Sequence, residues 1–143
     1  MTCPFCENKE IKERTILKNE FAWAFPTNIP IVPGHILIAP IRCVATWEEL
    51  KKEEQNAIMK LMETLKNALK KTFDAEGFHV AWNEGRVAGQ SVNHFHVHLI
   101  PRKKGDAGIT AYEPRKFLYR PGSREVSAEG ELKQIAELIQ KNL

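Results

Sequence analysis

Three histidines alternate with apolar residues in the stretch His94-Phe95-His96-Val97-His98. Because the side chains of a β-strand alternate between its two faces, an extended backbone here places the three imidazoles on one surface and Phe95 and Val97 on the opposite, apolar one. The strand rise of about 3.3 Å per residue then separates the backbones of successive histidines by roughly 6.5 to 7 Å. The pattern predicts a row of imidazoles held rigidly on a strand.

Such a row has three interpretations. The histidines can be ordinary surface or core residues, although strict alternation of three is unusual. They can bind a metal, since imidazole is a common zinc ligand and two histidines at positions i and i+2 can reach one ion. They can also form a catalytic set, in which one imidazole attacks a substrate and a neighbour positions it or handles a proton.

The loop that precedes the histidines favours the catalytic interpretation. Gly85 and Gly89 permit close backbone approach, and Asn83, Gln90 and Ser91 supply neutral hydrogen-bond donors. Backbone and amide donors in such a loop can hold phosphate oxygens while charge shifts during a displacement reaction. We therefore expect an anion-binding loop beside the histidines.

Cys3 and Cys6 form a second constellation, with the spacing of metal ligands. A pair of small apolar side chains near a terminus is the simplest alternative, and a redox dithiol lacks the expected strand-then-helix context. A closed structural zinc site needs four ligands, so the two cysteines alone are insufficient.

The hydrophobic pattern predicts the elements that position these residues. A possible capping box at Thr46 and Glu49 opens a long amphipathic helix that ends near Phe73, and Ser127 could cap a helix over about 128–142. Alternation and turn residues predict strands at 15–17, 21–25, 35–39, 78–82 and 93–100. We expect an α+β domain in which a largely antiparallel sheet of about five strands carries the helices on one face.

Composition limits the class of protein. The 143 residues include 43% hydrophobic and 27% charged residues, which predict a single globular domain over 1–143 with its core in 15–106. The net charge of +3 (21 Lys and Arg against 18 Asp and Glu) is too small to indicate nucleic-acid binding. Prolines interrupt the longest uncharged run, 21–41, so no membrane span is expected, and without a secretory-type start we expect a cytoplasmic protein.

The segment from Gly89 to Arg102 closely resembles the signature of the histidine triad family, His-φ-His-φ-His-φ-φ with φ apolar. The segment Pro30 to Ile38, which contains Pro33-Gly34-His35, is also similar to that family and to its fragile histidine triad branch in particular. The resemblance covers about Phe21 to Asp106. It implies a histidine triad fold and a homodimer.

The resemblance also implies roles for individual residues. His96 would attack an α-phosphate to form a nucleotidyl-histidine that water hydrolyses, and His98 would contact the phosphate and help to protonate the leaving group. The third triad position is glutamine in the related uridylyltransferases. The histidine at position 98 therefore makes this chain resemble the hydrolases and not the transferases. The implied substrate-binding residues are Thr27, Asn28, Asn83, Gly89, Gln90, Ser91 and His98.

A structural zinc is implied by the relatives that carry a Cys-x-x-Cys pair. In these relatives the site is completed by the histidines that match His35 and His94, so the implied ligands are Cys3, Cys6, His35 and His94. The fragile histidine triad branch lacks the cysteines. The remaining residues with reactive or aromatic side chains, Cys43, His79 and the tryptophans, are predicted to be structural.

The resemblance implies a nucleotide hydrolase that cleaves dinucleoside polyphosphates such as diadenosine tri- or tetraphosphate. A nucleoside phosphoramidase, a dinucleoside polyphosphate phosphorylase and a non-catalytic nucleotide-binding module remain as alternatives.

Overall fold

A five-stranded antiparallel sheet forms the centre of the molecule, as the sequence predicts. The structure is a computed structural model that describes residues 3–108 and 125–143. The strands follow the order β1-β2-β3-β5-β4, and each pairs antiparallel with its neighbours. Their bounds are β1 Leu17–Lys18, β2 Ala22–Pro26, β3 Ile36–Pro40, β4 Gly77–Ala81 and β5 Val97–Arg102.

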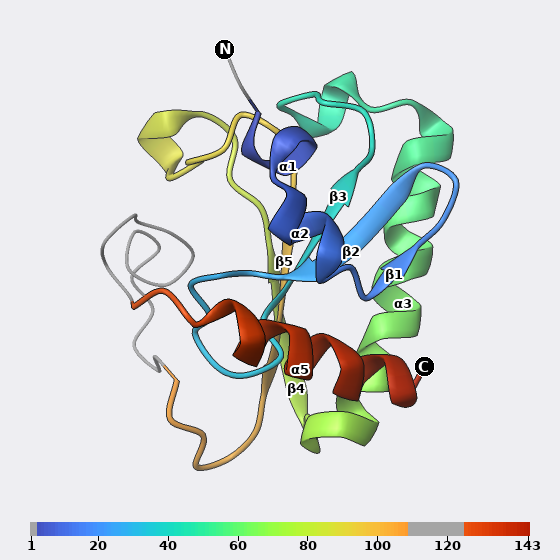
Figure 1. The fold of residues 1–143 in the computed structure, drawn as a ribbon. Helices are drawn as coiled ribbons and strands as arrows, with labels where there is room; N and C mark the ends of the chain where they lie inside the picture. The colour runs from blue at the N-terminus through green and yellow to red at the C-terminus, as the bar shows by residue number, and fades with distance from the viewer. Residues whose placement is uncertain (1–2, 109–124) are drawn as a thin grey trace.

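Two long helices cover one face of this sheet. Helix α3 (Lys52–Phe73) runs along β2, β3 and β5, and helix α5 (Glu129–Lys141) packs against α3 and β2 (Figure 1). Their apolar stripes meet the inward side chains of the strands in the main hydrophobic core. The predicted long helix and C-terminal helix are both confirmed.

Two short helices lie on the opposite face, where the sequence analysis predicts none. They are α1 (Pro4–Glu7) and α2 (Lys9–Glu13), and Asn8 caps α2 by accepting from the backbone N–H groups of Glu10 and Ile11. Phe5 and Ile11 pack on side chains of β2 and β3, in a second cluster with Phe25 and Leu37. This second layer closes the face of the sheet that carries the histidines.

The beginning of the long helix differs from the prediction. Thr46 and Glu49 open only a single 3-10 turn, η1 (Trp47–Glu49), and α3 begins at Lys52. Its first turn is instead fixed by the buried carboxylate of Glu54, which accepts from the backbone N–H of Lys51 at 2.7 Å and from Arg42. The bonds to Arg42 and Lys51 hold the pKa of Glu54 below its usual range.

The histidine-bearing strand is also shorter than predicted. β5 begins at Val97, so only His98 belongs to the hydrogen-bonded ladder, where it pairs with Leu37 of β3 and Ala81 of β4. The chain before β5 turns away from the sheet because the N–H of Phe95 donates to the carbonyl of Val44, in the loop after β3. Among the residues that the structure describes, no helix is long and apolar enough to span a membrane.

Candidate active site and metal centre

The three histidines of the motif lie together and buried, as the alternation predicts. Phe95, Val97 and Leu99 enter the core on the other side. The ring centroids of His96 and His98 are 5.1 Å apart, and Phe5 of α1 contacts the rings of both His94 and His96. Helix α1 therefore packs directly on the imidazole row.

The proton on His96 is placed by a backbone carbonyl. Nδ1 of His96 lies 2.8 Å from the carbonyl oxygen of His94, which can only accept, so Nδ1 carries the proton and donates it. The opposite nitrogen, Nε2, then holds a free lone pair. Burial lowers the pKa of His96 to about 4, which keeps the ring neutral at ordinary pH. The side chain has the tautomer and charge of a nucleophile.

A second chain of hydrogen bonds places the proton on His98. The backbone N–H of Ile31 donates to Nδ1 of His35 at 3.1 Å, so the proton of a neutral His35 is on Nε2. Nε2 of His35 lies 2.9 Å from Nδ1 of His98, which must accept. His98 therefore carries its proton on Nε2, as a donor.

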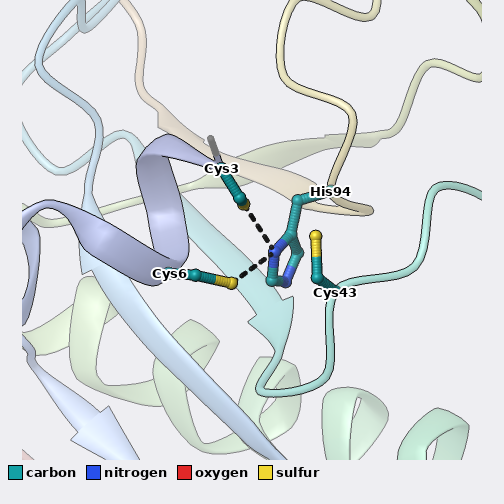
Figure 2. Close-up of side chains that lie close together, drawn as sticks. All are labelled: Cys3, Cys6, Cys43 and His94. Carbon is teal, nitrogen blue, oxygen red and sulfur yellow. Dashed lines mark hydrogen bonds between the residues drawn. The ribbon is translucent and has the colours of Figure 1, made fainter. Parts of the chain in front are cut away.

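Cys3, Cys6, Cys43 and His94 form a compact cluster of metal-ligating groups. Their ligand atoms all lie within 4.8 Å of one another, and Figure 2 shows the three sulfurs around the ring of His94. Nδ1 of His94 is 3.3 Å from the sulfur of Cys3 and 3.6 Å from that of Cys6. The cysteines come from the start of the chain around α1 and from the loop after β3.

This cluster corrects the predicted ligand set at one position. Cys43 takes the place expected for His35, whose ring nitrogens are instead bonded to Ile31 and His98. Cys43 is also exposed rather than part of the core, and partial desolvation of its sulfur together with the hydrogen bond to the Cys3 thiol raises its pKa to about 12. A third cysteine in a chain with a Cys-x-x-Cys pair is the signal that sequence analysis passed over.

The four groups fit a structural zinc. Nε2 of His94 donates to the carbonyl of Pro40 at 2.7 Å, which leaves the lone pair of Nδ1 facing the thiols. Neutral imidazole and thiolate are the usual ligands of closed tetrahedral zinc sites, with Zn–S distances of about 2.3 Å. A modest contraction of the cluster would bring three sulfurs and one nitrogen to such a geometry.

The loop from Gly85 to Ser91 (the glycine loop) is held by hydrogen bonds within the protein that the predicted anion-binding loop did not include. The carboxamide of Gln90 is buried, accepts from the N–H of Gly85 and donates to the carbonyl of Ala45, both at 2.8 Å. This side chain therefore holds the loop together through one of its two amide N–H groups and its oxygen, and its predicted role in substrate binding remains a prediction. Gly85 and Gly89 adopt positive φ angles of 88° and 98°, which other residues rarely adopt.

Asn83 and Ser91 retain donors for a substrate. Their side chains make no hydrogen bond within the described ranges 3–108 and 125–143, and Ser91 is exposed. Asn83 follows Ala81, the ladder partner of His98, by two residues. Their roles remain predictions.

A cavity of about 340 Å³ begins at Phe5 of α1, and its lining includes none of the three motif histidines. Phe5, whose ring centroid is 5.1 Å from that of His96, lines it together with Leu37 and Val92. Thr27 and Asn28, the predicted ribose-binding residues, line it as well. Phe5 is not predictable as a site residue, because nothing in the N-terminal sequence pattern shows that α1 folds over the triad.

Of the other residues predicted to be structural, the tryptophans pack within the protein and His79 does not. Trp23 is buried, and Trp47 stacks on Trp82 with ring centroids 5.2 Å apart. His79 is exposed on β4, so it is not a core residue.

Comparison with known proteins agrees with this architecture. The HIT domain model matches residues 8–105. An uncharacterized HIT-like protein from Methanocaldococcus jannaschii is 34% identical over 112 residues, which are 77% of this chain and 86% of that protein. The Bis(5'-adenosyl)-triphosphatase of Dictyostelium discoideum is 36% identical over 87 residues, which are 61% of this chain but only 58% of that enzyme.

The fold itself matches solved structures. A Zn-bound histidine triad family protein from Mycobacterium smegmatis superimposes with a TM-score of 0.74 at 20% identity, over 99% of this chain and 93% of that one. The chain belongs to the HIT, or histidine triad, family.

Proposed function

We propose that the protein is a nucleotide hydrolase that cleaves dinucleoside polyphosphates at the α-phosphate through a nucleotidyl-His96 intermediate. The observation that carries this proposal is the hydrogen bond from Nδ1 of His96 to the carbonyl of His94, which leaves Nε2 unprotonated. The similarity to a Bis(5'-adenosyl)-triphosphatase supports the substrate class.

In the first step, the lone pair of His96 Nε2 forms a bond to the α-phosphorus. The bond from that phosphorus to the bridging oxygen of the leaving nucleotide breaks, and its electron pair stays on this oxygen. His98 lies beside His96 and carries its proton on Nε2, so it can donate a hydrogen bond to the leaving oxygen, which departs with the ordinary negative charge of a phosphate group.

In the second step, water attacks the same phosphorus. The bond from phosphorus to His96 Nε2 breaks, and the nitrogen recovers its lone pair while a nucleoside monophosphate leaves. The proton that the attacking water loses passes to a phosphate oxygen of the departing monophosphate, and His98 keeps its own Nε2 proton throughout. Asn83 and Ser91 would donate to the phosphate oxygens.

The cavity beside Phe5 would hold the nucleoside of the reacting half. Phe5, Phe25 and Leu37 give it apolar walls for a flat base. Thr27 and Asn28 lie on the same wall, and we propose that they hydrogen-bond the ribose hydroxyls.

We also propose that Cys3, Cys6, Cys43 and His94 hold one structural zinc. When bound, the ion would fasten α1 to the loop after β3 and to the segment before β5. Because the carbonyl of His94 fixes the tautomer of His96, this anchoring also supports the nucleophile.

The proposal is tested with adenosine phosphoramidate and with diadenosine tri- and tetraphosphate, whose products are resolved with and without added inorganic phosphate. We expect AMP and the complementary nucleotide from the dinucleotides, in amounts that phosphate does not change. In His96→Gly, turnover should fall at least a thousandfold because the attacking atom is lost, while AMP still binds. Preferred cleavage of the phosphoramidate, or ADP formed in place of AMP when phosphate is added, would contradict the proposal in favour of a phosphoramidase or a phosphorylase.

A further inference from the structure

The carboxylate of Glu84 joins the end of β4 to a distant loop, and the proposed mechanism does not use it. The indole N–H of Trp82 donates to Oε2 of Glu84 at 2.9 Å, and the backbone N–H of Trp47 donates to the same oxygen at 3.2 Å. Trp47 begins η1, in the connection between β3 and α3. Glu84 itself stands between β4 and the glycine loop, so it fastens this corner of the site to the connection after β3.

The two tryptophans pack directly behind the histidine motif. Their rings stack with centroids 5.2 Å apart and an interplanar angle of 18°. Both also contact the ring of Phe95, with centroid distances of 5.7 Å for Trp47 and 5.4 Å for Trp82. Because Phe95 is fully buried and lies between His94 and His96 in the sequence, this packing fixes Trp82 relative to the triad.

The packing of Trp82 determines on which side Asn83 lies. Trp82 faces the main core, where Phe95 lies, whereas its neighbour Ala81 pairs with His98 and packs beside Ile100 on the other face of the sheet. Successive side chains of an extended chain alternate between the two faces. Asn83 therefore follows Ala81 onto the face that carries His98.

The residues on both sides of Asn83 are thus held in place. Phe95 holds Trp82, and two N–H groups hold Glu84. The carboxamide of Asn83 is half-buried and makes no hydrogen bond within residues 3–108 and 125–143. A donor on a backbone that is already fixed loses less conformational entropy when it binds a ligand, so its hydrogen bond contributes more to affinity.

We propose that Glu84 is a positioning residue that, through its bonds to Trp82 and Trp47, directs the carboxamide of Asn83 at the phosphate that His96 attacks. This inference rests on the proposed function, because it takes that phosphate to lie beside the triad. It adds a role for the Glu84 carboxylate and for the tryptophan pair, which the mechanism leaves without one.

Titration calorimetry of the full chain with AMP and with adenosine tests this inference without depending on turnover. We expect Asn83→Ala to weaken AMP binding about tenfold, the lower range for a hydrogen bond to a charged group, and Glu84→Ala to weaken it about fivefold. Adenosine has no phosphate for Asn83 to contact. Its affinity should therefore stay at the wild-type value in both variants, whereas general damage to the fold would weaken both ligands.

A double variant shows whether Glu84 acts through Asn83. Once Asn83 is replaced, Glu84 has nothing left to position, so Asn83→Ala/Glu84→Ala should lose about tenfold in AMP affinity, as Asn83→Ala does alone. Independent contributions would instead multiply to about fiftyfold. Glu48→Ala, an exposed carboxylate next to Trp47 in η1, is the matched control and should bind both ligands as the wild type does.

Trp82→Phe gives a second variant in case Glu84→Ala does not fold. Phenylalanine keeps a ring against Phe95 but removes the indole N–H, so AMP binding should weaken about two- to threefold, with no further loss when Asn83→Ala is added.

The outcomes separate this inference from the proposed function. Losses that multiply in the double variant, or an equal loss of adenosine affinity in Glu84→Ala, would overturn the positioning role and leave the hydrolase proposal standing. Wild-type AMP affinity in Asn83→Ala would do the same. Failure of the wild-type protein to bind AMP would overturn both.

Discussion

At the scale of single residues, main-chain groups determine what each imidazole can do. The carbonyls of His94 and Pro40 and the N–H of Ile31 fix the tautomers of His96, His94 and His35, and His35 in turn fixes His98. Spacing alone predicts that the triad shares one face. It does not predict these bonds, because Pro40 and Ile31 are distant in sequence and meet the histidines only in the folded sheet.

His35 is therefore expected to act as a positioning residue. His35→Ala removes the N–H that orients His98, so kcat should fall about ten- to a hundredfold while KM and zinc content stay near the wild-type values. Steady-state kinetics and metal analysis of the purified variant measure these quantities. Loss of zinc in His35→Ala would show that His35 is a ligand after all, as the sequence resemblance implied.

At the scale of elements, two cases show where sequence patterns are misleading. Thr46 and Glu49 match a capping box, yet they produce only a 3-10 turn, because Glu54 and Arg42 fix the beginning of α3 further along. The strand expected over 93–100 loses its first four residues because Phe95 bonds to the loop after β3. In both cases a long-range contact overrides a local signal.

The pair of Glu54 and Arg42 should make a measurable contribution to stability. Glu54→Gln replaces a buried carboxylate that receives three hydrogen bonds, so the free energy of unfolding at pH 7 should fall by about 1 to 2 kcal/mol. Urea denaturation measures this change, with the exposed neighbour Glu53→Gln as control.

The pH dependence of this effect has a definite sign. Because the folded-state pKa of Glu54 is lowered, its contribution is complete above the ordinary pKa of 4.5 and is lost as the pH falls through the folded value. The difference between wild type and Glu54→Gln should therefore shrink below about pH 4.5. A difference that persists unchanged in acid would contradict the assigned role of the carboxylate.

The proposed zinc ties α1 to two distant segments, so its loss should affect stability. We expect Cys43→Ser to retain less zinc and its free energy of unfolding to be lower by about 2 to 3 kcal/mol. This loss is a part of the roughly 10 kcal/mol that structural zinc contributes in small domains. Metal analysis and denaturation of the variant, beside the chelator-treated wild type, measure both quantities. A full equivalent of tightly held zinc in Cys43→Ser would remove Cys43 from the ligand set.

At the scale of the whole molecule, the α+β class and the order of strands and helices follow from the sequence pattern, because turn residues bound the short apolar strands and α3 has a continuous apolar stripe. The second layer made by α1 and α2 does not follow from it. These helices have four and five residues, which is too few for a helical period to show. Phe5 and Ile11 can be recognised as buried residues only from their packing on the sheet.

The homodimer implied by the resemblance remains a proposal, and β4 is the element that supports it. β4 is at one end of the strand order, and Val80 and Trp82 at this edge are 41% and 38% exposed. Exposed edge strands with apolar side chains readily pair with another chain. We expect a dimer in light scattering, and a monomer for Val80→Asp.

A control variant makes this test specific. Val87→Asp changes an exposed valine at the tip of the glycine loop, away from the ladder of β4 and β5, and should remain dimeric. A wild-type monomer, or a Val80→Asp variant that remains dimeric while folded, would rule out pairing through β4.

The most direct test of the mechanism is mass spectrometry of the protein quenched in acid-free denaturant within milliseconds of mixing with diadenosine triphosphate. We expect one adenylyl group per chain, attached to His96, which forms before AMP is released and is absent in His96→Gly. Turnover by the wild-type protein with no adduct on residue 96, or undiminished turnover by His96→Gly, would contradict it.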